Sequence, residues 1–177
     1  MNEALPIGIL AKLLYELNNQ VHLSLKVGNQ NYDATVKDKR MHPSSIEYIE
    51  VTVAGDGEQD YLRMRALNEF GQASGLGKAT KIQKQIIVVD EMLRQSDIVE
   101  RECANISKAI ERKLKKAYPM NTLLLLAFDD TMAFDRYDNQ QHIKETIHSY
   151  MPRLQHFHSV ALVGLPHETF IYHPYMP

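Results

Sequence analysis

Residues 46–54 constrain the fold of this chain more than any other stretch of its sequence. β-Branched residues dominate the stretch, and apolar and polar residues alternate along it, which is typical of a β-strand. Aliphatic side chains would then line one face of the strand, with Glu50 and Thr52 on the other face. A carboxylate among apolar neighbours is costly to bury unless a cation, a metal or a hydrogen-bond donor lies beside it. Glu50 is therefore a candidate site residue.

The length and composition are those of an ordinary globular protein. The chain has 177 residues, 44% hydrophobic and 24% charged, which favours a single domain over residues 1–177. The longest apolar run, 123–128, is the size of a strand and is too short to span a membrane. The amino terminus lacks the basic start of a signal peptide, and the lone Cys103 cannot form an intramolecular disulfide. We therefore expect a cytoplasmic protein that has no membrane partner.

Hydrophobic periodicity predicts helices and strands in mixed order. The long helix carries an apolar stripe, and the run that follows it is continuously apolar, as in a strand covered on both faces. Periodicity does not decide whether 86–89 is a short strand or the start of the next helix. The prediction is an α/β fold with a mixed central sheet flanked by helices. Helices are predicted over 5–19, 58–70, 95–118 and 138–150, and strands over 21–27, 32–37, 46–54, 121–128, 157–164 and 168–172.

A second carboxylate, Asp33, lies on the polar face of the predicted strand 32–37. If this strand pairs with 46–54 in a suitable register, Asp33 and Glu50 come within reach of one divalent cation. Oxygen ligands suit Mg²⁺ (or Mn²⁺), which is commonly held by one or two carboxylates and keeps several waters. Such an ion orients a phosphate and activates a water. The pair is thus a candidate metal site.

The order of elements and these two acidic positions resemble the PD-(D/E)XK, or restriction-endonuclease-like, nuclease superfamily. That family has a core of helix, three-stranded meander, helix and strand. Its first motif is matched by Asp33, and its second by Glu50-Val51-Thr52. The resemblance implies a metal-dependent hydrolysis of phosphodiesters in restriction, repair or phage defence, with DNA as the partner. It also implies that Glu16, in the first helix, assists the metal, with Arg63 and Arg65 as accessory residues after the third strand.

The chain departs from that pattern at Thr52, where the family has a lysine beside the scissile phosphate. Three explanations stay open. The lysine could come from elsewhere, either Lys37 or the cluster Lys78, Lys81 and Lys84, with Thr52 positioning water or phosphate. The metal alone could suffice. Or the site is inactive, and the chain is a binding or protein-interaction module, for a protein partner or as a homodimer.

The overall charge argues against bulk electrostatic binding of nucleic acid. The net charge is −2, so any affinity for a polyanion has to come from a local patch or from another subunit. The basic residues between 108 and 116 form one such patch at the end of the long helix. They complement the negative end of the helix dipole, so we interpret them mainly as a solvated helix end. Contact with phosphate is the second interpretation.

Overall fold

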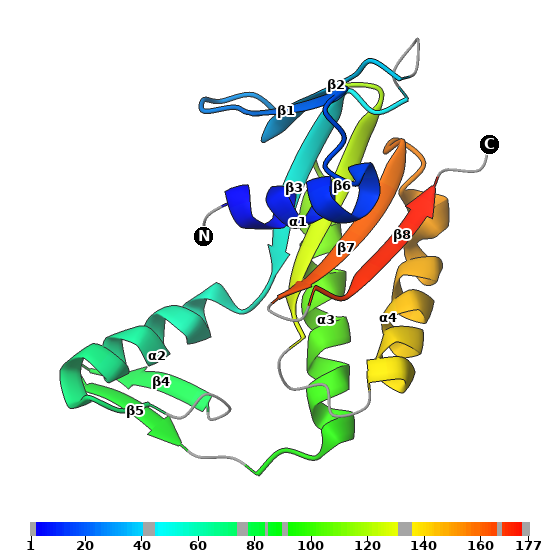
Figure 1. Ribbon diagram of the computed structural model, residues 1–177. Helices are drawn as coiled ribbons and strands as arrows, with labels where there is room; N and C mark the ends of the chain where they lie inside the picture. Colours follow the sequence, from blue (N-terminus) through cyan, green and yellow to red (C-terminus); the bar gives the residue numbers. More distant parts are fainter. Residues whose placement is uncertain are drawn as a thin grey trace.

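A computed structural model describes residues 3–40, 45–73, 78–83, 85–89, 92–130, 136–165 and 168–174. Within these ranges a mixed sheet has helices on both faces, and a smaller arm projects from it (Figure 1). The helices are α1 (Ala4–Tyr15), α2 (Gly57–Phe70), α3 (Gln95–Lys113), α4 (Arg136–Tyr150) and the short 3-10 helix η1 (Met151–Arg153). The strands are β1 (Val21–Leu25), β2 (Ala34–Asp38), β3 (Tyr48–Ala54), β4 (Lys78–Ile82), β5 (Gln85–Val89), β6 (Thr122–Asp129), β7 (Ser159–Leu165) and β8 (Phe170–Pro174).

The main sheet has six strands in the order β1-β2-β3-β6-β7-β8. β1, β2 and β3 form an antiparallel meander, as short connections between consecutive strands allow. β6 then lies parallel to β3, and β7 parallel to β6, because helical crossovers return the chain to the same end of the sheet. β8 closes the sheet antiparallel to β7. The predicted α/β class and mixed central sheet are confirmed.

β6 is the centre of the core. Leu123 and Leu125 pack into the cluster on the α1 side of the sheet, whereas Leu124 and Leu126 pack into the cluster beneath α3 and α4. All four side chains are fully buried. The continuous apolar run of the sequence is therefore a strand covered on both faces, as predicted.

β3 has the two different faces that its alternation predicts. Ile49 and Val51 belong to the core on the α1 side, while Ala54 packs into the core on the α3 side. Glu50 and Thr52 share the face of Ala54, and both are buried. Glu50 and Thr52 are thus covered by α3. On a strand with one solvent-exposed face, these two side chains would be exposed.

The arm consists of α2 and the two-stranded sheet of β4 and β5, and it projects beyond the end of β3 (Figure 1). Its small core comprises Leu62, Ala66, Ala79 and Ile86. The side chain of Gln59 joins helix to sheet, since its amide nitrogen donates to the carbonyl of Ala79 and its amide oxygen accepts from the nitrogen of Ala79, each at 2.8 Å. Segment 86–89 is a strand, and β4 before it was not predicted because 78–82 is too polar to show a strand pattern.

Two helices are shorter than their periodicity predicts. α1 ends at Tyr15 because Glu16 adopts a left-handed conformation (φ 52°), and its N–H bonds the carbonyl of Ala11. α3 ends at Lys113 and passes through a turn before the predicted stop near residue 118. Among the described residues, no helix combines the length and the apolarity needed to cross a membrane.

Candidate functional site

The site begins where β2 meets β3. The two strands pair in a register that continues to place Asp33, one residue before β2, beside Glu50. The backbone N–H of Asp33 donates to the carbonyl of Ile49 at 2.8 Å, and its carboxylate Oδ2 accepts from the N–H of Val51 at 2.7 Å. The Asp33 side chain therefore accepts the N–H of β3 that a backbone carbonyl would accept if β2 continued, just before the first residue of β2. The predicted adjacency of the two acidic strands is present.

Glu50 is buried and paired with a cation from α3. The Nζ atom of Lys113 lies 2.5 Å from Oε1 of Glu50, and the two side chains are only 14% and 6% exposed. Burial raises the pKa of the Glu50 carboxyl above its usual value, although the hydrogen bond and charge of Lys113 oppose this rise. The negative charge of Asp33 pushes the pKa of Glu50 further upward. The two carboxylates are thus close enough to repel one another.

Tyr118 adds a phenol to this cluster. Burial raises the pKa of its hydroxyl, and the charges of Glu50 and Asp33 raise it further. The phenol therefore keeps its proton at neutral pH, and its hydroxyl is buried without a hydrogen-bond partner in the described structure.

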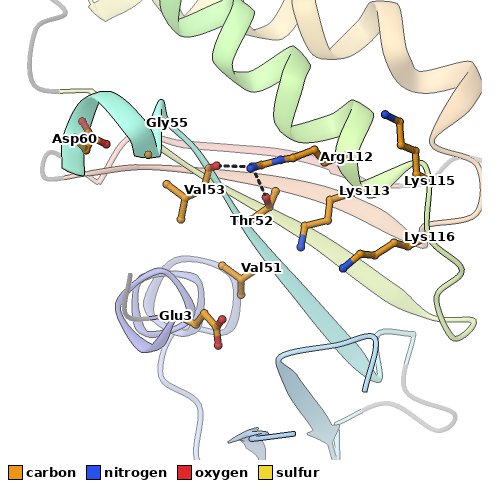
Figure 2. A pocket seen from close by; sticks show the side chains of 11 residues that line it. Glu3, Val51, Thr52, Val53, Gly55, Asp60, Arg112, Lys113, Lys115 and Lys116 are labelled. Atoms are coloured by element: carbon orange, nitrogen blue, oxygen red, sulfur yellow. Dashed lines mark hydrogen bonds between the residues drawn. The ribbon is translucent and has the colours of Figure 1, made fainter. Parts of the chain in front are cut away.

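Thr52 lies two residues beyond Glu50 on the same face of β3, and Arg112 reaches it from α3 (Figure 2). The Nη2 atom of Arg112 donates to the carbonyl of Val53 at 3.1 Å and lies 3.4 Å from Oγ1 of Thr52. The guanidinium is thereby held against the part of β3 that continues past its pairing with β2. Thr52 is buried under this guanidinium, which supplies positive charge at its hydroxyl.

A hollow of about 730 Å³ opens along this stretch of β3 (Figure 2). Lys113 and Lys116 extend toward β3 from the end of α3 in this view. Basic side chains outnumber acidic ones around the hollow, which makes it attractive to an anion. Its lining consists of Glu3, Val51, Thr52, Val53, Gly55, Gly57, Asp60, Arg112, Lys113, Lys115 and Lys116.

Two residues of the predicted site are not brought to the acidic pair. Glu16 is exposed at the carboxyl end of α1, on the face of the sheet opposite Glu50, and its charge acts on Arg40. Lys37 is exposed on β2 and lies opposite His22 of β1, four residues along the strand from Asp33. Glu16 and Lys37 therefore lie apart from Glu50, because of where α1 ends and because of the strand register, and their predicted roles at the site stay predictions.

The other predicted cations belong to the arm. Arg63 forms an ion pair with Asp60, and Arg65 lies over the ring of Tyr61. Lys78 and Lys81 are exposed on β4. Lys84, the third member of that predicted cluster, lies outside the described residues.

Sequence reasoning missed Lys113, which it grouped with a solvated helix end. One signal was present. Lys113 lies three residues after Ile110 and seven after Ile106, so it occupies the buried stripe of α3 at a position where an apolar residue is expected. A lysine on such a stripe and a glutamate in an apolar strand are each costly alone and are satisfied together. Because the two residues are 63 positions apart in the sequence, local patterns could not pair Lys113 with Glu50.

Within the described part of the chain, no cluster of three or more histidine, cysteine, aspartate or glutamate side chains is arranged to hold a metal ion. Comparison of the chain with protein-family models, with curated proteins and with solved structures finds no match in any of the three.

Proposed function

We propose that this protein is a metal-dependent phosphodiesterase that acts on nucleic acid, with Asp33 and Glu50 at its active site. One observation carries the proposal: buried Glu50 and partly buried Asp33 lie side by side on neighbouring strands, and Lys113, which pairs with Glu50, also lines the adjacent basic hollow. A hydrolase of phosphodiesters needs this combination, because it has to bind an anion and also hold acidic oxygens next to it.

The arrangement of elements supports the same proposal. α1 precedes an antiparallel meander of three strands, and helices then lead to β6, which lies parallel to β3. This is the order that the resemblance to the PD-(D/E)XK superfamily implies. The two acidic residues also lie where that resemblance expects them, one just before the second strand and one within the third.

The chemistry of the two carboxylates suits Mg²⁺ or Mn²⁺. Each has one oxygen engaged by the protein, Asp33 by the N–H of Val51 and Glu50 by Lys113, which orients the carboxylates. The repulsion between the two negative charges favours a cation between them. When bound, such an ion would supply a Lewis acid for the phosphate and an activated water.

Lys113 would fill the role that Thr52 cannot. Its amine reaches the acidic face of β3 from α3, beside the residue that replaces the family lysine. In that position the ammonium opposes the rise that burial gives the pKa of Glu50, and it would offer its remaining protons to a phosphate oxygen or to the attacking water. Thr52, with Arg112 at its hydroxyl, would position the phosphate.

A second candidate is a binding module that retains this fold without catalysis. The observation that favours it is the close Glu50–Lys113 pair, which satisfies both charges without any ligand. In this case the hollow binds an anionic partner, Glu50 holds β3 to α3 through Lys113, and Asp33 holds the start of β2 to β3.

Activity and metal binding of matched variants separate the two candidates. Purified protein is incubated with plasmid DNA, single-stranded DNA and RNA in Mg²⁺ or Mn²⁺, and Mn²⁺ binding is measured by electron paramagnetic resonance. We expect cleavage that requires the metal, loss of cleavage and weaker Mn²⁺ binding in Glu50→Gln, and a rate lowered about 10²–10³-fold in Lys113→Met. Lys37→Ala, at a cation that lies apart from Glu50, is the matched control and should cleave like the wild type.

Breaking a buried ion pair also destabilises the fold, by about 3–5 kcal/mol when one partner is lost. Rates are therefore compared per folded molecule, with unfolding followed by circular dichroism, and Lys113→Arg serves as the variant that keeps the charge. Absence of cleavage on every substrate, together with unchanged Mn²⁺ binding in Glu50→Gln, would refute the enzyme and leave the binding module.

A further inference from the structure

Four basic residues continue from the acidic site along the side of α3. Lys108 and Arg112 are one helical turn apart, and Lys115 and Lys116 follow in the turn after the helix end. All four side chains are exposed. We call this set the basic stripe. Lys116 lies near enough to the site for its charge to lower the pKa of Glu50, so the stripe starts at the carboxylates and runs toward the arm.

The stripe lies along two hollows. The first adjoins the acidic pair through Thr52 and Lys113, and a second of about 660 Å³ is lined by Lys108, Arg112 and Lys115 together with Asp56 at the start of α2. Arg112 and Lys115 line both hollows, so the hollows adjoin along α3. From Lys108 to the helix end at Lys113 the rise is roughly 7.5 Å at helical spacing, which matches about two nucleotides of a B-form strand before the turn that carries Lys115 and Lys116.

Arg112 is held by the carbonyl of Val53, but the three lysines of the stripe form no ion pair within the described structure. Glu111, the carboxylate within the same stretch, is held by the guanidinium of Arg153. The helix dipole does not explain Lys108 either, because dipole effects fade within the last turn and α3 continues for five more residues.

We propose that the basic stripe carries the phosphate backbone of a polynucleotide on one side of the scissile bond. The inference deepens the proposed function and rests on it, since it assigns the surface that binds the substrate chain beyond the scissile bond. The successive phosphates of a polynucleotide match a row of exposed cations along two adjoining hollows, whereas a single small phosphate would be bound by the first hollow alone. A net charge of −2 makes this local attraction the main source of affinity.

Binding without cleavage tests the stripe separately from catalysis. Fluorescence anisotropy with labelled 20-nucleotide single-stranded and duplex DNA is measured in EDTA, for the wild type and for the double variant Lys108→Glu/Lys115→Glu. We expect at least a tenfold loss of affinity, and a slope of log K against log salt reduced by roughly 1.5, since two phosphate contacts are lost. The double variant Lys39→Glu/Lys144→Glu makes the same charge change away from both hollows, and it should bind within twofold of the wild type.

Substrate length provides the second readout. We expect the wild type to cleave a 20-nucleotide strand far faster than a dinucleotide, and the double variant to lose that preference. Equal affinity of the two double variants for DNA would overturn the stripe while leaving the phosphodiesterase proposal intact. Binding that depends on Lys108 and Lys115 without any cleavage would support the stripe and refute catalysis. Equal competition by polyglutamate would overturn a nucleic-acid partner.

Discussion

At the scale of single residues, the Glu50–Lys113 ion pair bears on both the stability of the fold and the proposed activity. Replacing a buried ion pair with apolar side chains of similar volume is often neutral or stabilising, because desolvation offsets the attraction between the charges. The core cluster beneath α3 is apolar, so an apolar pair would fit beside it. The cost of burying the two charges is in keeping with the functional role proposed for Glu50 and Lys113.

Glu102, on α3, is a second carboxyl with a raised pKa, and this shift predicts that the free energy of unfolding depends on pH. Burial raises its pKa to about 7, and the negative charge of Asp129 adds to the rise. Its Oε2 atom is buried without a hydrogen-bond partner in the described structure. Because the folded protein holds this proton more tightly than the unfolded chain, the free energy of unfolding should fall as pH rises from about 4.5 to about 7. We expect Glu102→Gln to be more stable than the wild type at pH 8 and to show a shallower decline.

Chemical denaturation at several pH values measures this effect. Glu100→Gln removes an exposed glutamate from the same helix and serves as the matched control, with stability close to that of the wild type across the range. A Glu102→Gln variant that is less stable than the wild type at pH 8 would show that the ionised carboxylate has a stabilising partner.

At the level of elements, the junction of β2 and β3 depends on a side chain that acts in place of backbone. Asp33 accepts the N–H of Val51 beyond the last backbone pairing of the two strands. Asp33→Ala leaves that buried N–H without an acceptor and should cost about 1–3 kcal/mol. Asp33→Asn keeps an acceptor oxygen but loses the charge, so it should be more stable than Asp33→Ala and yet equally inactive with Mg²⁺. Denaturant unfolding and cleavage assays on the two variants check both expectations.

Wild-type cleavage by Asp33→Asn would mean that the charge of Asp33 has no part in catalysis. Equal stability of the alanine and asparagine variants would mean that the bond to Val51 contributes nothing to the junction. The two outcomes are independent, because one concerns charge and the other a hydrogen bond.

The whole molecule combines a well-packed body with a lightly packed arm. The body has two cores that meet at β6, whereas the four core residues of the arm include two alanines. α2 packs on β4 and β5, and large apolar side chains of the arm such as Tyr61, Met64 and Phe70 are exposed. Few buried apolar contacts give a low free energy of local opening. We therefore expect the backbone amides of α2, β4 and β5 to exchange hydrogen much faster than those of β6 and β7.

Hydrogen exchange followed by mass spectrometry measures both parts at once. Leu62→Ala should speed exchange in the arm and leave β6 protected, while Leu126→Ala should speed exchange in the body through global destabilisation. Protection of the arm equal to that of β6 would show that arm and body unfold as one cooperative unit.

Local periodicity by itself determined most elements of this protein and the orientation of its key strand. Alternation in 46–54 placed Glu50 and Thr52 on one face, and the apolar run 121–128 identified a strand buried on both sides. Both follow from side-chain geometry that depends only on near neighbours in the chain. The adjacency of Asp33 and Glu50 also followed, since short connections favour pairing of consecutive strands.

Only the tertiary structure decided which distant groups surround Glu50. Periodicity shows that a face is buried but not which element covers it, so Lys113 and Arg112 became site residues only when α3 packed over β3. The same packing left Glu16 and Lys37 outside the site. The physical reason is that a charge interacts through space, and the partner that offsets the desolvation of Glu50 lies 63 residues along the chain.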